Sequence, residues 1–273
     1  MENKSVKCGK LNISNKSSFT LIAGPCQLES EKHALEVATE LKIMTEKIGI
    51  GLIYKTSFDK ANRTSLKGKR GAGLEKSLPV FDKIRKDVGI PVLTDVHNAE
   101  QCAVVSKHVD ILQIPAFLCR QTDLLIAAAK TNKIINVKKG PFLSGESCQF
   151  IIEKIQRCGN NQILITERGN SFGYQNLVVD MRNIPIIKNY QVPVIIDATH
   201  SNQKPNQPIG QSGGTPDFIE TIAHAGIAAG ANGIFLETHP NPTKALSDGS
   251  NMLPLSKLEE LLVQLIAIKK IVH

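Results

Sequence analysis

Short apolar runs recur along the chain, and each is followed by polar residues and then by a segment with helical periodicity. The runs that we expect to be strands are 20–23, 51–54, 91–94, 111–114, 134–137, 163–166, 194–197 and 233–236. Strands that alternate with helices form a parallel sheet, and eight such units in 273 residues favour a closed (β/α)8 TIM barrel. A doubly wound open sheet is the alternative, but the chain lacks the Gly-x-Gly-x-x-Gly turn that would support it.

The limits of two helices can be placed from local signals. Apolar residues spaced by three or four over 74–88 predict a helix that Gly89 ends. Ser256 with Glu259 predicts a capping box at the start of the last helix. These signals extend the repeating pattern to the end of the chain.

Composition bounds the domain organisation. With 41% hydrophobic residues the chain can bury a large core, and no shift in composition divides it. We therefore expect residues 1–273 to be a single barrel domain, with residues 1–18 as an N-terminal arm or hairpin.

The same bulk properties exclude several classes of protein. The N-terminus lacks the apolar core of a signal peptide, and the most apolar stretch, 222–236, is broken by polar residues and glycines. The six cysteines contain no Cys-x-x-Cys pair, which indicates reduced thiols. We expect a cytoplasmic protein with no membrane contact.

The net charge of +8 raises the possibility of nucleic-acid binding. However, the aromatic residues form no pattern for base stacking, and the lysines are scattered along the chain. We expect no nucleic-acid partner. A subset of the cations gathered in one cleft would suit a small polyanionic substrate better.

Residues that follow the strands of a (β/α)8 barrel share one face, however far apart they are in the sequence. In this chain they are Cys26, Lys55, Asp95, Gln113, Lys138, Arg168, His200 and Glu237. This set is richer in reactive and charged side chains than ordinary loop ends, which favour Ser, Asn and Gly.

A cationic set stands out among these positions. Its members are Lys55, Lys60, Arg63, Lys138 and Arg168, and three of them lie in the polar segment 54–65. Arginine offers a planar fork and lysine a point charge to phosphate or carboxylate. If the barrel brings these residues together, the site is built for more than one anionic group.

A second set consists of Cys26, His200, Glu237 and Asp248. Thiolate, imidazole and carboxylate are metal ligands, and a mixed set suits Zn²⁺ or Fe²⁺. Each residue alone has an ordinary explanation, as a buried thiol, a loop histidine or a turn residue. Their positions after the first, seventh and eighth strands matter more, because those strands are neighbours in a closed barrel.

Eight segments resemble a known family, the 3-deoxy-D-manno-octulosonate 8-phosphate synthases of the DAHP synthase superfamily. They are 24–30, 55–65, 113–118, 136–139, 167–169, 172–174, 197–200 and 236–240. The likeness runs from about residue 18 to residue 256, and Lys-Ala-Asn-Arg-Thr-Ser at 60–65 is its most specific part. The sister synthases that make the seven-carbon shikimate precursor typically carry Lys-Pro-Arg-Thr there.

The resemblance implies an enzyme that condenses phosphoenolpyruvate with D-arabinose 5-phosphate and water, for lipopolysaccharide biosynthesis. It implies that Lys60, Lys138, Arg168 and Gln113 hold phosphoenolpyruvate, with Lys55 and Ser57 near its carboxylate. Asn62, Arg63 and Thr64 would take the pentose phosphate, Ala116 would line the substrate site, and Asp95 would lie beside sugar and metal. The catalytic group would be Lys60, Asp95, Lys138 and His200. The family is usually a homotetramer, in which Arg120 would reach a neighbouring subunit's site.

The position of Cys26 divides this family, since metal-independent members have asparagine there. The resemblance therefore implies a metal-dependent enzyme with Cys26, His200, Glu237 and Asp248 as ligands. Segment 247–252 combines features of both classes, and the ion could be Zn²⁺, Fe²⁺ or Mn²⁺. His200 could instead act as an acid or base, but a ligand histidine is poorly placed for both tasks.

Two alternatives remain at this point. The closer one is a sister synthase that uses erythrose 4-phosphate or an amino sugar as acceptor. The other is a non-catalytic binder of phosphosugars or nucleic acid, which would exploit the positive charge. The second alternative leaves Cys26, His200 and Glu237 unexplained.

Overall fold

The structure of the chain, a computed structural model, describes residues 5–14, 19–63, 68–204 and 213–272. Within these residues a ring of parallel strands closes, because β14 pairs with both β3 and β11. In ring order the strands are β3 Thr20–Gly24, β4 Gly51–Lys55, β5 Val92–Asp95, β6 Ile111–Ile114, β7 Ile134–Lys138, β8 Ile163–Glu167, β11 Val194–Asp197 and β14 Gly233–His239. Each predicted apolar run contributes one strand, so the prediction of a (β/α)8 barrel is confirmed and the open sheet is excluded.

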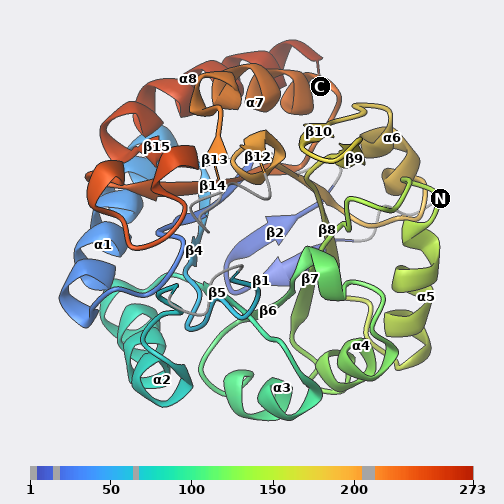
Figure 1. The fold of residues 1–273 in the computed structure, drawn as a ribbon, viewed down its shortest axis with the longest axis horizontal. Coiled ribbons are helices and arrows are strands. Elements are labelled where there is room, and N and C mark those ends of the chain that lie inside the picture. Colours follow the sequence, from blue (N-terminus) through green and yellow to red (C-terminus); the bar gives the residue numbers. More distant parts are fainter. Residues whose placement is uncertain (1–4, 15–18, 64–67, 205–212, 273) are drawn as a thin grey trace.

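The helices surround this ring, as Figure 1 shows. They are α1 Glu31–Ile48, α2 Leu74–Lys83, α3 Ala99–Val105, α4 Thr122–Ala129, α5 Cys148–Arg157, α6 Asn183–Lys188, α7 Ile219–Ala228 and α8 Leu255–Val272. Each turns an apolar stripe toward the strands; in α1 the buried residues include Ala34, Val37 and Leu41, spaced by three and four. Because helices cover the outer face of the ring and side chains fill its interior, the strands are buried almost along their whole length and are largely apolar except toward their carboxyl ends. None of the helices in the described ranges has the length and apolar character that crossing a membrane would require.

The helix predicted over 74–88 is present in two parts. Helix α2 passes into one π-helical turn, η1 Ile84–Val88, and Gly89 ends it with a left-handed φ of 76°. The capping box predicted at Ser256 is wrong, because α8 begins one residue earlier, at Leu255. Strand β15 Leu253–Pro254 pairs with the end of β14 directly before it, so sheet pairing rather than a cap sets the start of this helix.

An antiparallel hairpin closes the bottom of the barrel. It consists of β1 Val6–Cys8 and β2 Leu11–Ile13, and it lies across the middle of the view in Figure 1. Its apolar side chains pack against inward residues of the strands, among them Ile53 and Ile195. Just before β14, Asn232 donates a hydrogen bond to the carbonyl oxygen of Ser14. The expected N-terminal hairpin is therefore present at the amino ends of the strands, while residues 1–4 and 15–18 of the arm lie outside the described residues.

The segments at the opposite, carboxyl ends carry further short elements. Two small hairpins are β9 Asn170–Phe172 with β10 Asn176–Val178, and β12 Gln203–Lys204 with β13 Gly213–Gly214. Single 3-10 turns are η2 Ala116–Leu118, η3 His200–Asn202, η4 Pro216–Phe218, η5 Pro242–Lys244 and η6 Gly249–Asn251. Local structure is thus concentrated at the end of the barrel where the chemically rich residues were predicted.

Candidate active site

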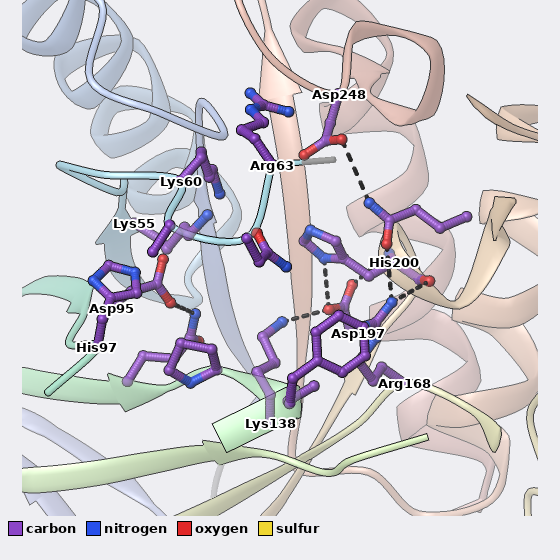
Figure 2. A pocket seen from close by; sticks show the side chains of 17 residues that line it. Lys55, Lys60, Arg63, Asp95, His97, Lys138, Arg168, Asp197, His200 and Asp248 are labelled. Carbon is purple, nitrogen blue, oxygen red and sulfur yellow. Dashed lines mark hydrogen bonds and ion pairs between the residues drawn. The ribbon is translucent and has the colours of Figure 1, made fainter. Parts of the chain in front are cut away.

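A pocket lies at the carboxyl ends of the barrel strands, and most of the predicted site residues line it. Those that do are Lys55, Lys60, Asn62, Arg63, Asp95, Gln113, Ala116, Lys138, Arg168, His200 and Asp248. Figure 2 shows Lys55, Lys60 and Asp95 on one side of this pocket and Asp197, His200 and Arg168 on the other. Side chains from strands across the whole barrel therefore converge on one space.

The strands position these side chains at or near their ends. Lys55, Asp95 and Lys138 are the last residues of β4, β5 and β7. The strand predicted to end before Glu237 is longer, because β14 continues to His239 and pairs Glu237 with Gly24 of β3. Glu237 thus belongs to the sheet itself, which holds its carboxylate rigidly.

Glu237 forms ion pairs with two lysines, Lys55 and Lys60. Lys55 Nζ lies 2.6 Å from Glu237 Oε1 and donates a second hydrogen bond to the carbonyl oxygen of Cys26, while Lys60 Nζ is 3.8 Å from the same carboxylate oxygen. Burial by itself would raise the pKa of Glu237, but Lys55, His200 and Lys60 outweigh it and hold the pKa well below its usual value. The carboxylate is therefore ionised even though it is fully buried.

Asp95 stands at the head of a chain of buried hydrogen bonds. It accepts bonds from Ser57 and from Gln113, and Asn136 of β7 donates to Gln113 Oε1 at 2.8 Å. The positive charges of Lys55 and Lys60 overcome the effect of burial and lower the pKa of Asp95. This network places an ionised carboxylate on the wall of the pocket in a fixed orientation.

Asp197 links two of the predicted residues. Its Oδ2 atom contacts Lys138 Nζ and lies 2.8 Å from His200 Nδ1, while the backbone N–H of His200 donates to Oδ1 at 2.8 Å. The Lys138 ammonium also sits 3.0 Å above the centre of the Phe235 ring, a cation–π contact. Burial lowers the pKa of Lys138 from 10.5 to about 8, although Asp197 offsets part of this effect.

The two arginines have guanidinium groups available to a ligand. Arg168 Nη2 donates to the carbonyl oxygen of His200 and to Gln203 Oε1, and Arg63 Nε donates to the carbonyl oxygen of Lys69. Among the described residues neither arginine forms a salt bridge, and the buried Arg63 Nη2 and Arg168 Nε have no hydrogen-bond partner. Unfilled donors of this kind suit the oxygens of phosphate or carboxylate.

Three of the four predicted metal ligands lie close together. The ligand atoms of Cys26, Glu237 and Asp248 are within 4.8 Å of one another, and Cys26 Sγ is 2.9 Å from Asp248 Oδ2. His200 lies outside this mutual set, although its Nε2 is 3.4 Å from Glu237 Oε2. Burial, together with Asp248 and Glu237, raises the pKa of the Cys26 thiol well above its usual value, so the apo site holds a protonated thiol.

The donor set fits a divalent transition metal. A thiol, two carboxylates and an adjacent imidazole combine soft and borderline ligands, as Zn²⁺ and Fe²⁺ prefer. Glu237 Oε2 is buried and has no hydrogen-bond partner among the described residues, so it can accept a further ligand contact. His200 is oriented by its Nδ1 contact to Asp197, an arrangement typical of histidines that bind metal through the other nitrogen.

Some predicted residues lie elsewhere. Ser57 does not line the pocket but hydrogen-bonds Asp95 and receives a bond from Lys60 Nζ at 3.1 Å. Arg120 is exposed after η2 and is absent from the pocket lining. Thr64 lies outside the described residues.

Sequence reasoning missed several residues of this site. Those with polar or charged side chains are His97, Asp197 and Gln203, and it also missed Phe235, whose ring lies under the Lys138 ammonium. Asp197 is the last residue of β11, but the sequence-based prediction assigns His200, three residues later, to that strand end. The signal that could have found Asp197 is its spacing of three residues from His200, which suits a carboxylate that orients a histidine. Phe235 reads as an ordinary core residue, and only the packing places a cation over its ring.

The chain is similar to known proteins over nearly its whole length. Residues 3–273 match the family described as the DAHP synthetase I family. Relatives named 2-dehydro-3-deoxyphosphooctonate aldolase, from Brucella anthropi, Brucella ovis and Brucella abortus, are each 55% identical over 269 residues. In each case the match covers 98% of this chain and 97% of the relative.

Proposed function

Because this chain belongs to the DAHP synthetase I family, we propose that it is an enzyme that condenses phosphoenolpyruvate with D-arabinose 5-phosphate and water. The products are 3-deoxy-D-manno-octulosonate 8-phosphate and inorganic phosphate, and the reaction serves lipopolysaccharide biosynthesis. The observation that carries this proposal is the convergence of five cations on one pocket, namely Lys55, Lys60, Arg63, Lys138 and Arg168. The names and identity of the relatives support the same reaction.

The charges of the pocket suit these substrates. A phosphate monoester carries roughly −1.5 to −2 charges at neutral pH, so two phosphates and a carboxylate bring about four or five negative charges. Asp197 and Glu237 already neutralise part of the lysine charge, which lowers the electrostatic repulsion among the cations of the pocket. The two arginines retain unfilled donors and can take the phosphates directly.

The arrangement of the lining residues suggests which of them bind each of the two substrates. Lys60, Gln113, Lys138 and Arg168 all line the pocket, where they would surround and hold phosphoenolpyruvate. Arg63 also lines an adjoining hollow, together with Lys69 and several residues between 242 and 250, so we propose that it holds the pentose phosphate there with Asn62. The resemblance assigns Thr64 to the same phosphate, but Thr64 lies outside the described residues. Ala116 is also part of the pocket lining.

This placement would let proximity supply much of the reduction in the barrier. The C3 carbon of phosphoenolpyruvate attacks the aldehyde carbon of the pentose, and water adds to C2. The resulting hemiketal phosphate loses inorganic phosphate by cleavage of its C–O bond. Lys138 stays in contact with Asp197 and can hold a proton near the departing phosphate.

We propose that Cys26, His200, Glu237 and Asp248 hold a divalent metal ion, Zn²⁺, Fe²⁺ or Mn²⁺. Such an ion supplies Lewis acidity, which polarises an aldehyde oxygen or a water molecule. Asp197 keeps the His200 ring oriented for this role through its contact with Nδ1. Asp95 lies across the pocket from His200 and Asp248 (Figure 2), where it can accept hydrogen bonds from sugar hydroxyls.

Location and assembly complete the proposal. All six cysteines lie in the described residues as free thiols, which suits the reducing cytoplasm.

Phe117, Phe142 and Phe172 follow the neighbouring strands β6, β7 and β8 and are more than half exposed. Exposed aromatic groups of this kind support an interface, and we propose a homotetramer in which Arg120 reaches a neighbouring site. Sedimentation of the purified protein at several concentrations measures the assembly.

One assay tests the reaction against its alternatives. The purified, metal-supplemented protein is incubated with phosphoenolpyruvate and, separately, arabinose 5-phosphate, erythrose 4-phosphate, ribose 5-phosphate or an amino sugar. We expect release of inorganic phosphate with arabinose 5-phosphate at a rate far above that with the other sugars. Preference for erythrose 4-phosphate would identify a sister synthase. No phosphate release with any sugar, together with salt-dependent binding of nucleic acid, would favour a non-catalytic binder.

A further inference from the structure

A second cluster of polar side chains lies beside the candidate metal ligands. It consists of Glu29, His33 and His239, whose potential ligand atoms are within 4.8 Å of one another. Glu29 precedes α1, His33 is in its first turn, and His239 is the last residue of β14. The His239 side chain is only 7% exposed, and its ring lies 4.7 Å from that of His33. Nothing in the proposed reaction uses these groups.

The composition of this cluster is that of a metal site, but its hydrogen bonds argue against one. The backbone N–H of Asn241 donates to His239 Nδ1 at 2.9 Å, so that nitrogen carries no proton. The neutral ring must then carry its proton on Nε2, the nitrogen that faces Glu29 Oε1 at 3.5 Å. A protonated nitrogen is a hydrogen-bond donor and cannot coordinate a metal ion. We therefore interpret the cluster as a carboxylate placed against a histidine ring, since His239 Nε2 lies 3.5 Å from Glu29 Oε1 and has no hydrogen-bond partner among the described residues.

Glu29 connects three segments that each carry a proposed metal ligand. Its Oε1 atom accepts a hydrogen bond from the backbone N–H of Leu246 at 3.0 Å and faces His239 Nε2. Glu29 follows Cys26 by three residues in the sequence. Likewise, His239 follows Glu237 by two residues, and Leu246 precedes Asp248 by two. The Glu29 carboxylate, on the segment that carries Cys26, thus binds the backbone just before Asp248 and lies against the ring of His239, two residues after Glu237.

The segment that carries Asp248 depends more on a stabilising contact of this kind than the segments that carry Cys26 and Glu237. Cys26 and Glu237 are held by the barrel, since Cys26 follows β3 directly and Glu237 lies within β14. Asp248 lies in a loop between two single 3-10 turns and has a left-handed φ of 50°. A residue other than glycine adopts this conformation at a cost of about 1–3 kcal/mol, so surrounding contacts must maintain it. The bond from Leu246 to Glu29 is one such contact at the start of this loop.

We infer that Glu29 is a positioning residue for the metal site, which it organises by holding the Leu246–Asp248 segment against the segment that carries Cys26. This inference rests on the proposed metal-dependent function. It assigns the cluster an indirect role, since Glu29 is neither one of the proposed metal ligands nor one of the residues that line the main pocket. Residues that orient metal ligands from outside typically contribute 10- to 100-fold in metal affinity.

The test is a measurement of metal affinity rather than of activity alone. The apo proteins are titrated with Zn²⁺ and with Mn²⁺ in competition with a chromophoric chelator, and the stoichiometry is recorded. We expect Glu29→Ala to weaken metal binding by about 10- to 100-fold. Glu29→Gln keeps an oxygen that can accept the Leu246 N–H and should restore the affinity to within a few-fold of the wild type. Glu31→Ala is the matched control, because Glu31 lies two residues away and pairs with Lys83 at the surface.

Several outcomes would overturn the inference. One is a Glu29→Ala protein that binds metal as tightly as the wild type, and another is a Glu29→Gln protein as weak as Glu29→Ala. A loss of affinity matched by an equal loss of unfolding free energy in the apo protein would show a general folding defect instead. A second bound equivalent that His33→Ala removes would show that the cluster is itself a metal site.

Measuring metal binding and phosphate release on the same wild-type protein tests the role of Glu29 separately from the proposed reaction. A wild-type protein that binds no divalent ion overturns the role of Glu29. If the same protein still releases phosphate from phosphoenolpyruvate and arabinose 5-phosphate, the proposed condensation stands.

Discussion

At the scale of single residues, the site combines buried charges that neutralise one another with charges left for the substrates. Lys55 and Lys138 each have a carboxylate partner, Glu237 and Asp197. Breaking a buried pair of this kind usually costs several kcal/mol, because it leaves an uncompensated charge in the interior. Replacing Arg63 or Arg168 carries no such penalty, since these two pocket arginines pair with no carboxylate among the described residues. Substitutions of the arginines are therefore the cleaner probes of substrate binding.

Arg63→Ala should raise the KM for arabinose 5-phosphate far more than the KM for phosphoenolpyruvate. The reason is that Arg63 lines both the pocket and the hollow proposed for the pentose phosphate, and its Nη2 has no hydrogen-bond partner among the described residues. Loss of a charge-assisted contact of this type costs about 1.5–3 kcal/mol, or roughly 10- to 150-fold in KM. Steady-state kinetics with each substrate varied in turn measure both constants. Equal effects on the two substrates would contradict this placement.

The pH dependence of phosphoenolpyruvate capture should report on Lys138. Its pKa is lowered to about 8, so the free enzyme carries this charge below pH 8 and loses it as the pH rises. We expect kcat/KM for phosphoenolpyruvate to fall above about pH 8, because this ratio reflects groups of the free enzyme. Lys138→Arg remains charged throughout this range and should lack the decline, whatever its absolute rate. The same decline in wild type and Lys138→Arg would assign it to another group.

Cys26→Ala should abolish metal-dependent turnover. The thiol is 2.9 Å from Asp248 Oδ2 and belongs to the set that includes Glu237, so its loss removes one ligand from the centre of the proposed site. Metal analysis of the purified variant and phosphate release after thorough chelation of the wild type measure the effect. A chelated wild-type enzyme with full activity would show that the metal proposal is wrong. Cys158→Ala, at a thiol far from the ligand set, is the control.

At the scale of secondary-structure elements, contacts between helices and strands hold the ends of the strands in place. Helix α7 lies directly on β11, the strand that ends at Asp197. A Cβ atom at Gly226 would come within 2.6 Å of Ile196 Cγ1, so only glycine permits this close approach. The position of Asp197, and through it of Lys138 and His200, depends on this contact.

Gly226→Ala should lower the free energy of unfolding by about 1 kcal/mol. Alanine favours the helix by about 1 kcal/mol, but forcing an extra methyl into a packed core costs about 1–3 kcal/mol. Urea unfolding measures the change, and a rise in KM for phosphoenolpyruvate should accompany it as β11 shifts. Glu220→Ala, an exposed substitution in the same helix, should leave both values nearly unchanged. A stabilised Gly226→Ala protein would show that α7 can move away from the strand without cost.

At the scale of the whole molecule, stability and chemistry lie at opposite ends of the barrel. The β1–β2 hairpin packs against the lower layer of inward side chains, while the pocket opens at the carboxyl ends of the strands. Ile13 is fully buried in this lower layer. In (β/α)8 enzymes this separation lets the loops carry the chemistry while the opposite end maintains the fold.

Ile13→Ala should reduce stability without changing substrate affinity. Truncating a buried isoleucine typically costs about 2–5 kcal/mol. Ile43→Ala is a matched control on α1, because that side chain is 63% exposed and should contribute little. Chemical unfolding measures the first effect, and KM values at a temperature where both variants are folded measure the second. A large rise in either KM for Ile13→Ala would show that the two ends of the barrel are coupled.

The sequence by itself determined the class of fold and most of the chemistry. Continuous apolar runs of four or five residues can be buried only in a sheet covered on both faces, and their alternation with helical patterns leaves few topologies. Topology then brings strand ends to one face, so Lys55, Asp95 and Lys138 could be assigned to a common site from their spacing alone. The start of α8 was misplaced, because a local capping signal was overruled by the pairing of β15 with β14.

Only the tertiary structure decided how the charged groups pair. Asp197 serves Lys138 and His200 at once, Phe235 lies beneath a lysine, and Glu29 reaches the loop before Asp248. Apart from the contact between Asp197 and His200, these contacts join residues far apart in the sequence at distances of about 3 Å, and no periodicity encodes them. They depend on the register of the strands and on the path of the loops. The sequence thus names the groups that can do the chemistry, and packing in three dimensions selects which of them act together.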